Sequence, residues 1–167
     1  MSMLVYLIRH GIAMDREDPD CPPDAERMLT KKGIEKARLV IEGLAQLGAK
    51  PDEVLSSPLV RAIETAEIAA KVLHYPKDKI RRTDALLPEA DPSALIRELA
   101  RLKVEQVLCA GHAPHMDEFI ALATGSRRSF TALKKAGVAV IEFESVAPGA
   151  GLLAALFSPR VFKRLND

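Results

Sequence analysis

The 167-residue chain carries a formal net charge of +1 and is 48% hydrophobic, a composition typical of globular proteins. The near-neutral charge argues against a broad electrostatic footprint for nucleic acid or an anionic membrane. The length predicts a single domain over residues 1–167. Cys21 and Cys109 lie far apart, so the sequence indicates neither a disulfide framework nor a zinc site.

No apolar run approaches the ~18 residues that a membrane span requires. The chain also shows no basic region ahead of an apolar segment at its N-terminus. We therefore expect a soluble, cytoplasmic protein with no membrane or nucleic-acid partner.

The first elements alternate between strand and helix. The apolar residues 4–8 predict a buried strand that ends just before Gly11. The polar, acidic and proline-rich residues 15–27 predict a loop. Thr30 predicts the N-cap of a helix with apolar residues at helical spacing, and Gly48 predicts its end.

The same alternation continues through the middle of the chain. Val54 and Leu55 predict a short second strand. Ser57, as a hydroxyl cap, and Pro58, at the first helical position, predict a helix that runs to about His74. Residues 79–83 predict a third short strand, and a loop follows it.

The second half begins with a helix opened by Asp91 and Pro92. Residues 106–111 predict a further buried strand. A helix then starts at Ala113–Pro114 and closes at Gly125.

Two late strands are expected at residues 137–143 and 152–157, and residues 160–167 predict either an edge helix or a frayed tail. Strands that alternate with helices predict an α/β fold. We expect a three-layer α/β/α sandwich whose central sheet is mostly parallel, with an antiparallel edge at the end.

Three predicted strand-to-helix junctions carry side chains suited to binding an anion: Arg9-His10-Gly11, Ser57-Pro58 with Arg61 in the first helical turn, and Gly111-His112-Ala113-Pro114. In a parallel sheet these junctions meet at one edge. Two arginines, two histidines and free helix N-terminal N–H groups would then surround a dianionic phosphoryl group. Without such a ligand, the cluster of cations would be costly.

These motifs resemble those of the histidine phosphatase superfamily, the phosphoglycerate mutase-like phosphatases named for their Arg-His-Gly motif. The matching segments occur in family order between about residues 4 and 125: Leu7-Ile8-Arg9-His10-Gly11, Leu29-Thr30-Lys31-Lys32-Gly33, Ser56 to Ala62 with Thr65-Ala66, Glu89, and Gly111-His112-Ala113-Pro114. The short length and the lack of a large insertion after Glu89 most resemble the SixA-type phosphohistidine phosphatases.

The resemblance implies a role for each residue. His10 would be the nucleophile that forms a phosphohistidine intermediate. Arg9 and Arg61 would hold the phosphoryl oxygens, with no metal or cofactor, because the guanidinium groups carry the charge. The remaining phosphate contacts would come from His112, Ala113, Gly11 and Ser57.

Glu89 occupies the position of the family's general acid, which protonates an alkoxide leaving group and then activates water. Imidazole is a better leaving group than an alkoxide, so a phosphohistidine phosphatase depends less on such an acid. The alternative for Glu89 is a solvated loop carboxylate beside Asp91.

Other residues also have ordinary structural interpretations. Arg61 would be a surface ion-pair partner of Glu64 or Glu67, and His112 a helix cap. His74 fits a partner of a helix dipole, and His115 a solvated helix position.

Cys21 and Arg27 have the C-x5-R spacing of cysteine-dependent phosphatases. The two prolines between them remove backbone donors, and the two acidic residues repel an anion. We therefore reject a cysteine-dependent mechanism.

The expected function is hydrolysis of a protein phosphohistidine, on a phosphotransfer domain or a phosphocarrier, with inorganic phosphate as the product. The acidic residues 15–27 would rim the site and influence the choice of protein partner. A small-molecule phosphomonoesterase of the same fold is the first alternative. A non-catalytic module that binds a phosphorylated ligand is the second, and it would not require His10.

Overall fold

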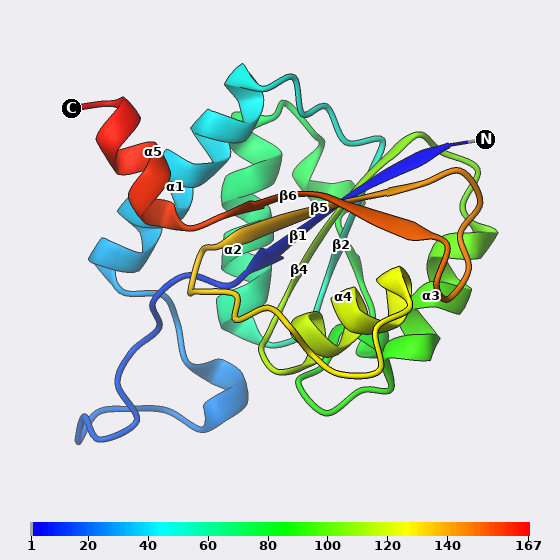
Figure 1. The fold of residues 1–167 in the computed structure, drawn as a ribbon. Coiled ribbons are helices and arrows are strands. Elements are labelled where there is room, and N and C mark those ends of the chain that lie inside the picture. The colour runs from blue at the N-terminus through cyan, green and yellow to red at the C-terminus, as the bar shows by residue number, and fades with distance from the viewer. Residues whose placement is uncertain (1) are drawn as a thin grey trace.

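The computed structural model describes residues 2–167, which form one six-stranded sheet with helices on both faces (Figure 1). The strands and α-helices are β1 (Met3–Arg9), α1 (Lys31–Gln46), β2 (Glu53–Ser56), α2 (Val60–Val72), β3 (Arg81–Arg82), α3 (Pro92–Arg101), β4 (Gln106–Gly111), α4 (His115–Thr124), β5 (Val138–Phe143), β6 (Gly151–Phe157) and α5 (Pro159–Leu165). Three short 3-10 helices lie between them: η1 (Asp24–Glu26), η2 (Lys77–Lys79) and η3 (Asp84–Leu86).

The strand order is β3-β2-β4-β1-β5-β6. The first four strands are parallel, and β5 and β6 add an antiparallel edge beside β1. This confirms the predicted α/β class, the mostly parallel sheet and the antiparallel edge. None of the helices in residues 2–167 is both long and apolar enough to cross a membrane.

Two hydrophobic clusters fill the spaces above and below the sheet. One packs α3 and α4 against residues such as Val5, Leu7 and Cys109. The other packs α1, α2 and α5 against Ile8 and Leu108. Because neighbouring residues of β1 face opposite clusters, the strand is buried on both sides, which explains its continuous apolar run.

Several expected helix caps are present. Thr30 caps α1, with its Oγ1 accepting the Gly33 N–H at 3.0 Å. Asp91 caps α3 by accepting the Ser93 N–H at 2.9 Å. The C-terminal residues form helix α5, whose Phe162 is buried against Gly43 of α1, so the alternative of a frayed tail is not observed.

The start of α2 differs from the prediction. The helix begins at Val60 with Leu59 as its N-cap residue, two residues later than the Ser57-Pro58 pattern indicated. Ser57 is not the helix cap, because its hydroxyl contacts the His112 ring. Helix α4 likewise begins at His115, just after Pro114.

The loop that follows β1 packs directly on the first turn of α1. The Ile12 carbonyl accepts hydrogen bonds from the Thr30 N–H at 2.9 Å and the Thr30 hydroxyl at 3.3 Å. A side chain on Gly33 would collide with the same carbonyl, and a Cβ on Gly11 would lie 2.9 Å from the Gly33 oxygen. The glycines therefore permit a backbone contact that fixes the loop after β1.

We expect Gly33→Ala to lower the free energy of unfolding by about 1–3 kcal/mol, because the new methyl group has backbone rather than a mobile side chain against it. Urea denaturation would measure the loss. Lys32→Ala, at an exposed position of the same helical turn, is the control and should change stability little. Equal stability of both variants would contradict the close packing.

Candidate active site

Three junctions meet at one edge of the sheet because β1, β4 and β2 are parallel and end in register. Arg9 pairs with Gly111, and Ser56 pairs with Ala110. The pairing extends one residue beyond the end of β1, where the His10 N–H donates to the Gly111 carbonyl at 2.9 Å. The Ser57 N–H donates to the Ala110 carbonyl at 3.0 Å.

A cleft of about 890 Å³ opens at this edge. Six of the residues singled out from the sequence line it: Arg9, His10, Arg61, Glu89, His112 and Ala113. Gly11 and Ser57 do not line the cleft, but the Gly11 carbonyl oxygen contacts His10 and the Ser57 hydroxyl contacts His112. The structure thus brings together the three junctions that the sequence pattern assigned to one site.

The His10 ring is held in one tautomer. Its Nδ1 lies 2.7 Å from the carbonyl oxygen of Gly11, and the side chain is only 6% exposed. Because a carbonyl oxygen can only accept, Nδ1 carries the proton in this contact. The Nε2 atom of the neutral ring therefore keeps its lone pair.

The surroundings of His10 also keep the ring neutral. Burial lowers its pKa to about 4; the hydrogen bond to Gly11 opposes this shift, and the charges of Arg61, Arg9 and Lys135 add to it. A ring with such a pKa is almost entirely unprotonated at pH 7. His10 thus presents an unprotonated Nε2, as a nucleophile requires.

His112 lies beside His10, with 5.2 Å between the ring centroids. Its Nε2 is 2.7 Å from the Ser57 hydroxyl, which also accepts the Leu59 N–H at 3.3 Å. Burial lowers the pKa of His112 to about 3, and the neighbouring His10 and Arg61 contribute further. Ser57 therefore orients this ring rather than capping α2.

Three buried nitrogen atoms of the cleft residues have no hydrogen-bond partner within residues 2–167: Arg9 Nε, Arg61 Nε and His112 Nδ1. A buried donor without an acceptor costs about 1–3 kcal/mol. An arginine Nε always carries a proton, so at least two of these atoms are unsatisfied donors. These three residues of the cleft thus keep hydrogen-bonding capacity that other protein groups do not use.

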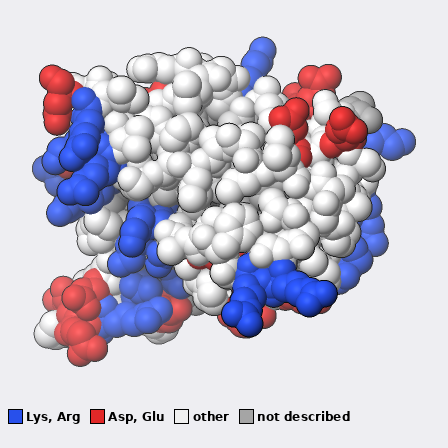
Figure 2. All heavy atoms as spheres, in the orientation of Figure 1, with Lys and Arg blue, Asp and Glu red and all other residues white. Residues whose placement is uncertain are grey.

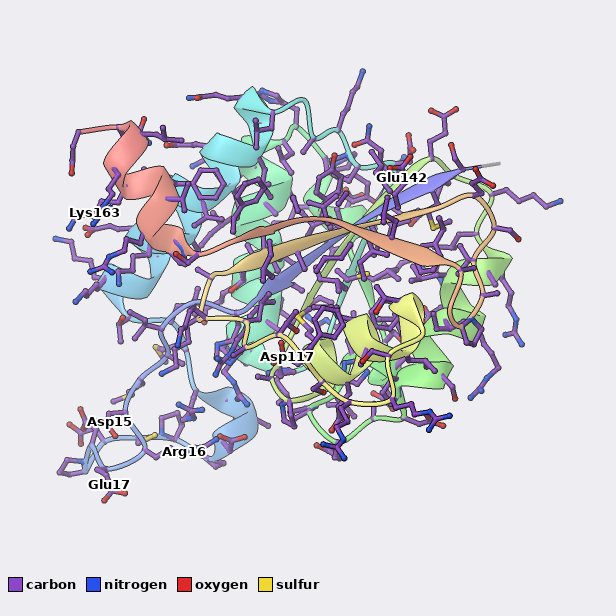
Figure 3. All side chains as sticks on the ribbon, in the orientation of Figure 1. Asp15, Arg16, Glu17, Asp117, Glu142 and Lys163 are labelled. Carbon is purple, nitrogen blue, oxygen red and sulfur yellow. The ribbon has the colours of Figure 1, made fainter. Side chains whose placement is uncertain are left out.

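Arg9 is oriented by a short chain of contacts from α4 and the segment before β5. Its Nη1 donates to the Leu133 carbonyl at 2.8 Å. The buried Asp117 accepts the Leu133 N–H at 3.0 Å and the Thr131 hydroxyl at 2.7 Å. In Figure 3, Asp117 lies beneath the sheet, near α4. Its carboxylate thus fixes the carbonyl that holds Arg9.

Arg61, in the first turn of α2, is buried and pairs with a residue that the sequence did not suggest. Its Nη1 donates to the Asp24 carbonyl at 2.9 Å, and its Nη2 donates to Asp24 Oδ2 at 3.3 Å. The alternative of a surface ion pair with Glu64 or Glu67 is therefore wrong. The Thr65 hydroxyl, which donates to the Arg61 carbonyl, accepts the Gly11 N–H at 3.2 Å and links α2 to the loop after β1.

The loop of residues 15–27 rims the cleft, as expected, but it also brings basic side chains to the site. Arg27 is only 8% exposed, lines the cleft and donates to Met14 and Asp24. Arg16, like Arg27, contacts Asp24. Figure 3 shows Arg16 close to η1, and Figure 2 shows acidic and basic atoms gathered on this loop at the lower left.

The acidic residues of this loop, Asp24 among them, were expected at the rim, but the contacts of Asp24 with Arg27 and Arg61 were missed because the sequence indicated only a loop there. The three-residue spacing of Asp24 and Arg27 in D-A-E-R is the one local signal, since it matches one helical turn. Lys135 also lines the cleft, from a segment between α4 and β5 that carried no motif.

Two further residues named from the sequence, His115 and Glu89, differ in how exposed they are. His115 is fully buried, so the expectation of a solvated helix position is wrong; the α4 helix begins at His115 and turns its ring inward. Glu89 is exposed at the edge of the cleft.

No group of three or more His, Cys, Asp or Glu side chains within residues 2–167 is arranged to hold a metal ion.

A neutral histidine beside buried arginine donors, at the carboxyl edge of a parallel α/β sheet, is an arrangement typical of a phosphate-binding site. Comparison with known proteins agrees, since residues 5–87 match the family model "Histidine phosphatase superfamily (branch 1)". The chain belongs to the histidine phosphatase superfamily, and the predicted enzyme class, a phosphatase, is confirmed.

Similar proteins cover the chain to different extents. An uncharacterised protein from Picosynechococcus is 36% identical over 81% of this chain and 82% of its own length. The mitochondrial serine/threonine-protein phosphatase Pgam5 of Drosophila persimilis is 39% identical over 53% of this chain, which spans only 29% of that protein. A structure of the protein histidine phosphatase SixA with tungstate superposes with a TM-score of 0.85, at 25% identity, over 95% of this chain and 99% of the other.

We expect NMR of the ¹⁵N-labelled protein to show the His10 ring neutral and protonated on Nδ1 at pH 7, because the Gly11 carbonyl selects this tautomer. The ring should become protonated only near pH 4. A His10→Asn variant assigns the signals. Titration of His10 near its ordinary value of about 6.5, or protonation on Nε2, would contradict this description.

Proposed function

We propose that this phosphatase hydrolyses a protein phosphohistidine through a covalent phospho-His10 intermediate. The observation that carries the proposal is the unprotonated Nε2 of His10 in a cleft where Arg9, Arg61 and His112 each keep an unpartnered buried nitrogen. A phosphoryl group supplies both an electrophile for Nε2 and acceptor oxygens for the donors. The similar SixA structure is complexed with tungstate, which like phosphate is an oxyanion.

The reaction follows from these atoms. The lone pair of Nε2 attacks phosphorus, the new N–P bond forms, and the N–P bond of the substrate breaks while Arg9 and Arg61 stabilise the equatorial oxygens. The departing imidazole takes up a proton from water or from Glu89. Water then attacks the phospho-His10 phosphorus and gives a proton to Glu89 or to solvent, which replaces the proton that the leaving imidazole took. The N–P bond to Nε2 breaks, inorganic phosphate leaves, and His10 returns to its neutral form.

Catalysis by this route needs no metal ion, because guanidinium groups balance the negative charge on the phosphoryl oxygens. Arginine stays protonated even when burial lowers its pKa, as it does for Arg9 and Arg61. Metal independence is therefore part of the proposal. So are a single histidine phosphatase domain over residues 1–167 and the expected cytoplasmic location.

A protein substrate is supported by the shape of the rim. The cleft is bordered by exposed side chains of the 15–27 loop, by Glu89 and by Lys135, rather than by an inserted lid. A phosphohistidine presented on a phosphotransfer domain or phosphocarrier could reach His10 from this side. The charges on the rim would then contact the surface of the partner.

We expect the protein to release phosphate from a phosphohistidine-bearing phosphotransfer protein much faster than from a panel of small phosphomonoesters. His10→Ala should abolish the release, because the intermediate cannot form. Arg61→Ala should keep a rate about 10²–10³ times lower, the usual cost of losing one donor to a developing charge. A continuous enzyme-coupled phosphate assay at neutral pH, in the presence of a chelator, measures all three.

The outcomes separate the candidate functions. Turnover of small esters alone would assign the site to a small phosphorylated metabolite and contradict the protein substrate. Binding of phosphate without turnover of any substrate would favour a non-catalytic module. Turnover that requires an added metal ion would contradict metal independence.

A small-molecule phosphomonoesterase is the second candidate, and the position of Glu89 favours it. This carboxyl group is exposed and lines the cleft, so in this proposal it is the proton donor to a leaving alkoxide. An alkoxide leaving group requires such an acid far more than imidazole does.

We therefore expect Glu89→Gln to reduce turnover of alkyl phosphates by about 10²–10⁴ while leaving phosphohistidine turnover within about tenfold. Steady-state kinetics on the two substrate types would measure the difference. Asp91→Asn, a nearby carboxylate outside the cleft lining, is the matched control. Equal losses on both substrates would contradict the assignment of Glu89 as a leaving-group acid.

A further inference from the structure

Asp24 interacts with the arginine that the proposed mechanism assigns to the phosphoryl oxygens. The two terminal nitrogens of Arg61 both donate to it, Nη1 to the backbone carbonyl at 2.9 Å and Nη2 to Oδ2 at 3.3 Å. Guanidinium binds carboxylate and phosphate with the same planar donors. The Asp24 carboxylate thus engages a donor of Arg61 that a phosphoryl oxygen would use.

The burial of the two partners shows on which side the carboxylate lies. The Asp24 side chain is 51% exposed, whereas the Arg61 side chain is 4% exposed. Asp24 therefore stands between solvent and a buried guanidinium group. An anion that reaches Arg61 Nη2 from the cleft has to compete with this carboxylate.

Asp24 is also held by two other arginines, through its second oxygen. Arg27 Nε lies 2.9 Å from Oδ1, and Arg16 Nη2 lies 3.1 Å from the same atom. Burial alone would raise the pKa of Asp24, but the hydrogen bond from Arg27 and the charge of Arg61 outweigh burial and hold the pKa below its usual value. The group is thus a carboxylate whenever the enzyme binds substrate.

The carboxylate contact with Arg61 can be lost without releasing Asp24 from the loop. It is the longest of the three ion pairs, and the oxygen that makes it, Oδ2, has no other partner within residues 2–167. If Oδ2 moves away, Arg16 and Arg27 can still hold Oδ1 nearby. One carboxylate among three arginines also leaves a local excess of positive charge that can accept a second anion.

We propose that Asp24 is an internal competitor for phosphate: its carboxylate engages Arg61 in the free enzyme, yields to the incoming phosphoryl group, and returns as inorganic phosphate leaves. This inference rests on the proposed function, in which Arg61 binds the phosphoryl oxygens. It makes Asp24 a specificity-determining residue, because weakly charged anions cannot displace a carboxylate. It also distinguishes Asp24 from the other acidic residues of the loop, which do not contact Arg61.

The test measures binding of inorganic phosphate by calorimetry. Asp24→Asn keeps the size of the side chain and removes its charge, so phosphate should bind about tenfold more tightly. In steady-state kinetics, KM for an aryl phosphate and the inhibition constant for phosphate should fall together. Glu26→Gln is the matched control, since it removes an equal charge from an exposed position of the same 3-10 turn and has no contact with Arg61.

Each result has a defined meaning. Equal tightening in Asp24→Asn and Glu26→Gln would overturn the inference, because it would show a general change of charge. Weaker binding in Asp24→Asn would overturn it as well, since Asp24 would then support Arg61. Failure of wild-type protein and Asp24→Asn to bind phosphate would overturn the proposed function itself, whereas equal binding by the two would overturn the inference alone.

A second measurement needs no variant. In wild-type protein labelled with ¹³C-aspartate, the Asp24 carboxyl signal should shift as phosphate is added, because the carboxylate leaves Arg61. Asp24→Asn identifies the signal. A carboxyl signal that stays fixed while phosphate saturates the site would overturn the inference.

Discussion

The active site depends on the parallel register of β1, β4 and β2. These strands end side by side, so that Arg9 lies opposite Gly111 and the His10 N–H reaches the Gly111 carbonyl. A shift of one residue in any strand would turn its side chains to the opposite face. The apolar residues on both faces of β1 prevent such a shift, since each one belongs to a filled core. Core packing therefore determines where the side chains at the strand ends lie.

Burial affects the histidines and the arginines of the site differently. The same desolvation that keeps His10 and His112 unprotonated leaves the arginines charged, because an arginine pKa lies too far above 7 for burial to neutralise it. His10, which must be neutral to act as the proposed nucleophile, can thus lie beside arginines that stay charged. The Gly11 carbonyl accepts a hydrogen bond from His10 Nδ1, and this leaves the lone pair on Nε2.

Much of this arrangement was predictable from the sequence because it depends on local patterns. Apolar runs gave the strands, the Thr30 and Asp91 caps gave two helix starts, and the order of the motifs placed Arg9, His10, Arg61 and His112 at one edge. What was missed depends on contacts between distant segments. Ser57 looks like a helix cap until His112 lies beside it, 55 residues away in sequence.

The errors at the loop and at α4 have the same origin. The polar composition of residues 15–27 indicates a loop but not that Asp24 reaches Arg61, 37 residues further along the chain. His115 looks like a surface residue of a helix start, yet the turn before α4 directs it into the interior. The contact of Asp24 and the burial of His115 both depend on tertiary packing, which cannot be seen in a single sequence.

The contacts of the two arginines differ in a way that matters for function. Arg9 is held by the neutral Leu133 carbonyl, which the buried Asp117 fixes from behind, so its position does not depend on a displaceable charge. Arg61 is held by the backbone carbonyl of Asp24 and also by its half-exposed carboxylate. A phosphoryl group can add to the first contact but has to replace part of the second. The site therefore has one permanent anchor and one that is shared between substrate and protein, which favours turnover over tight retention of phosphate.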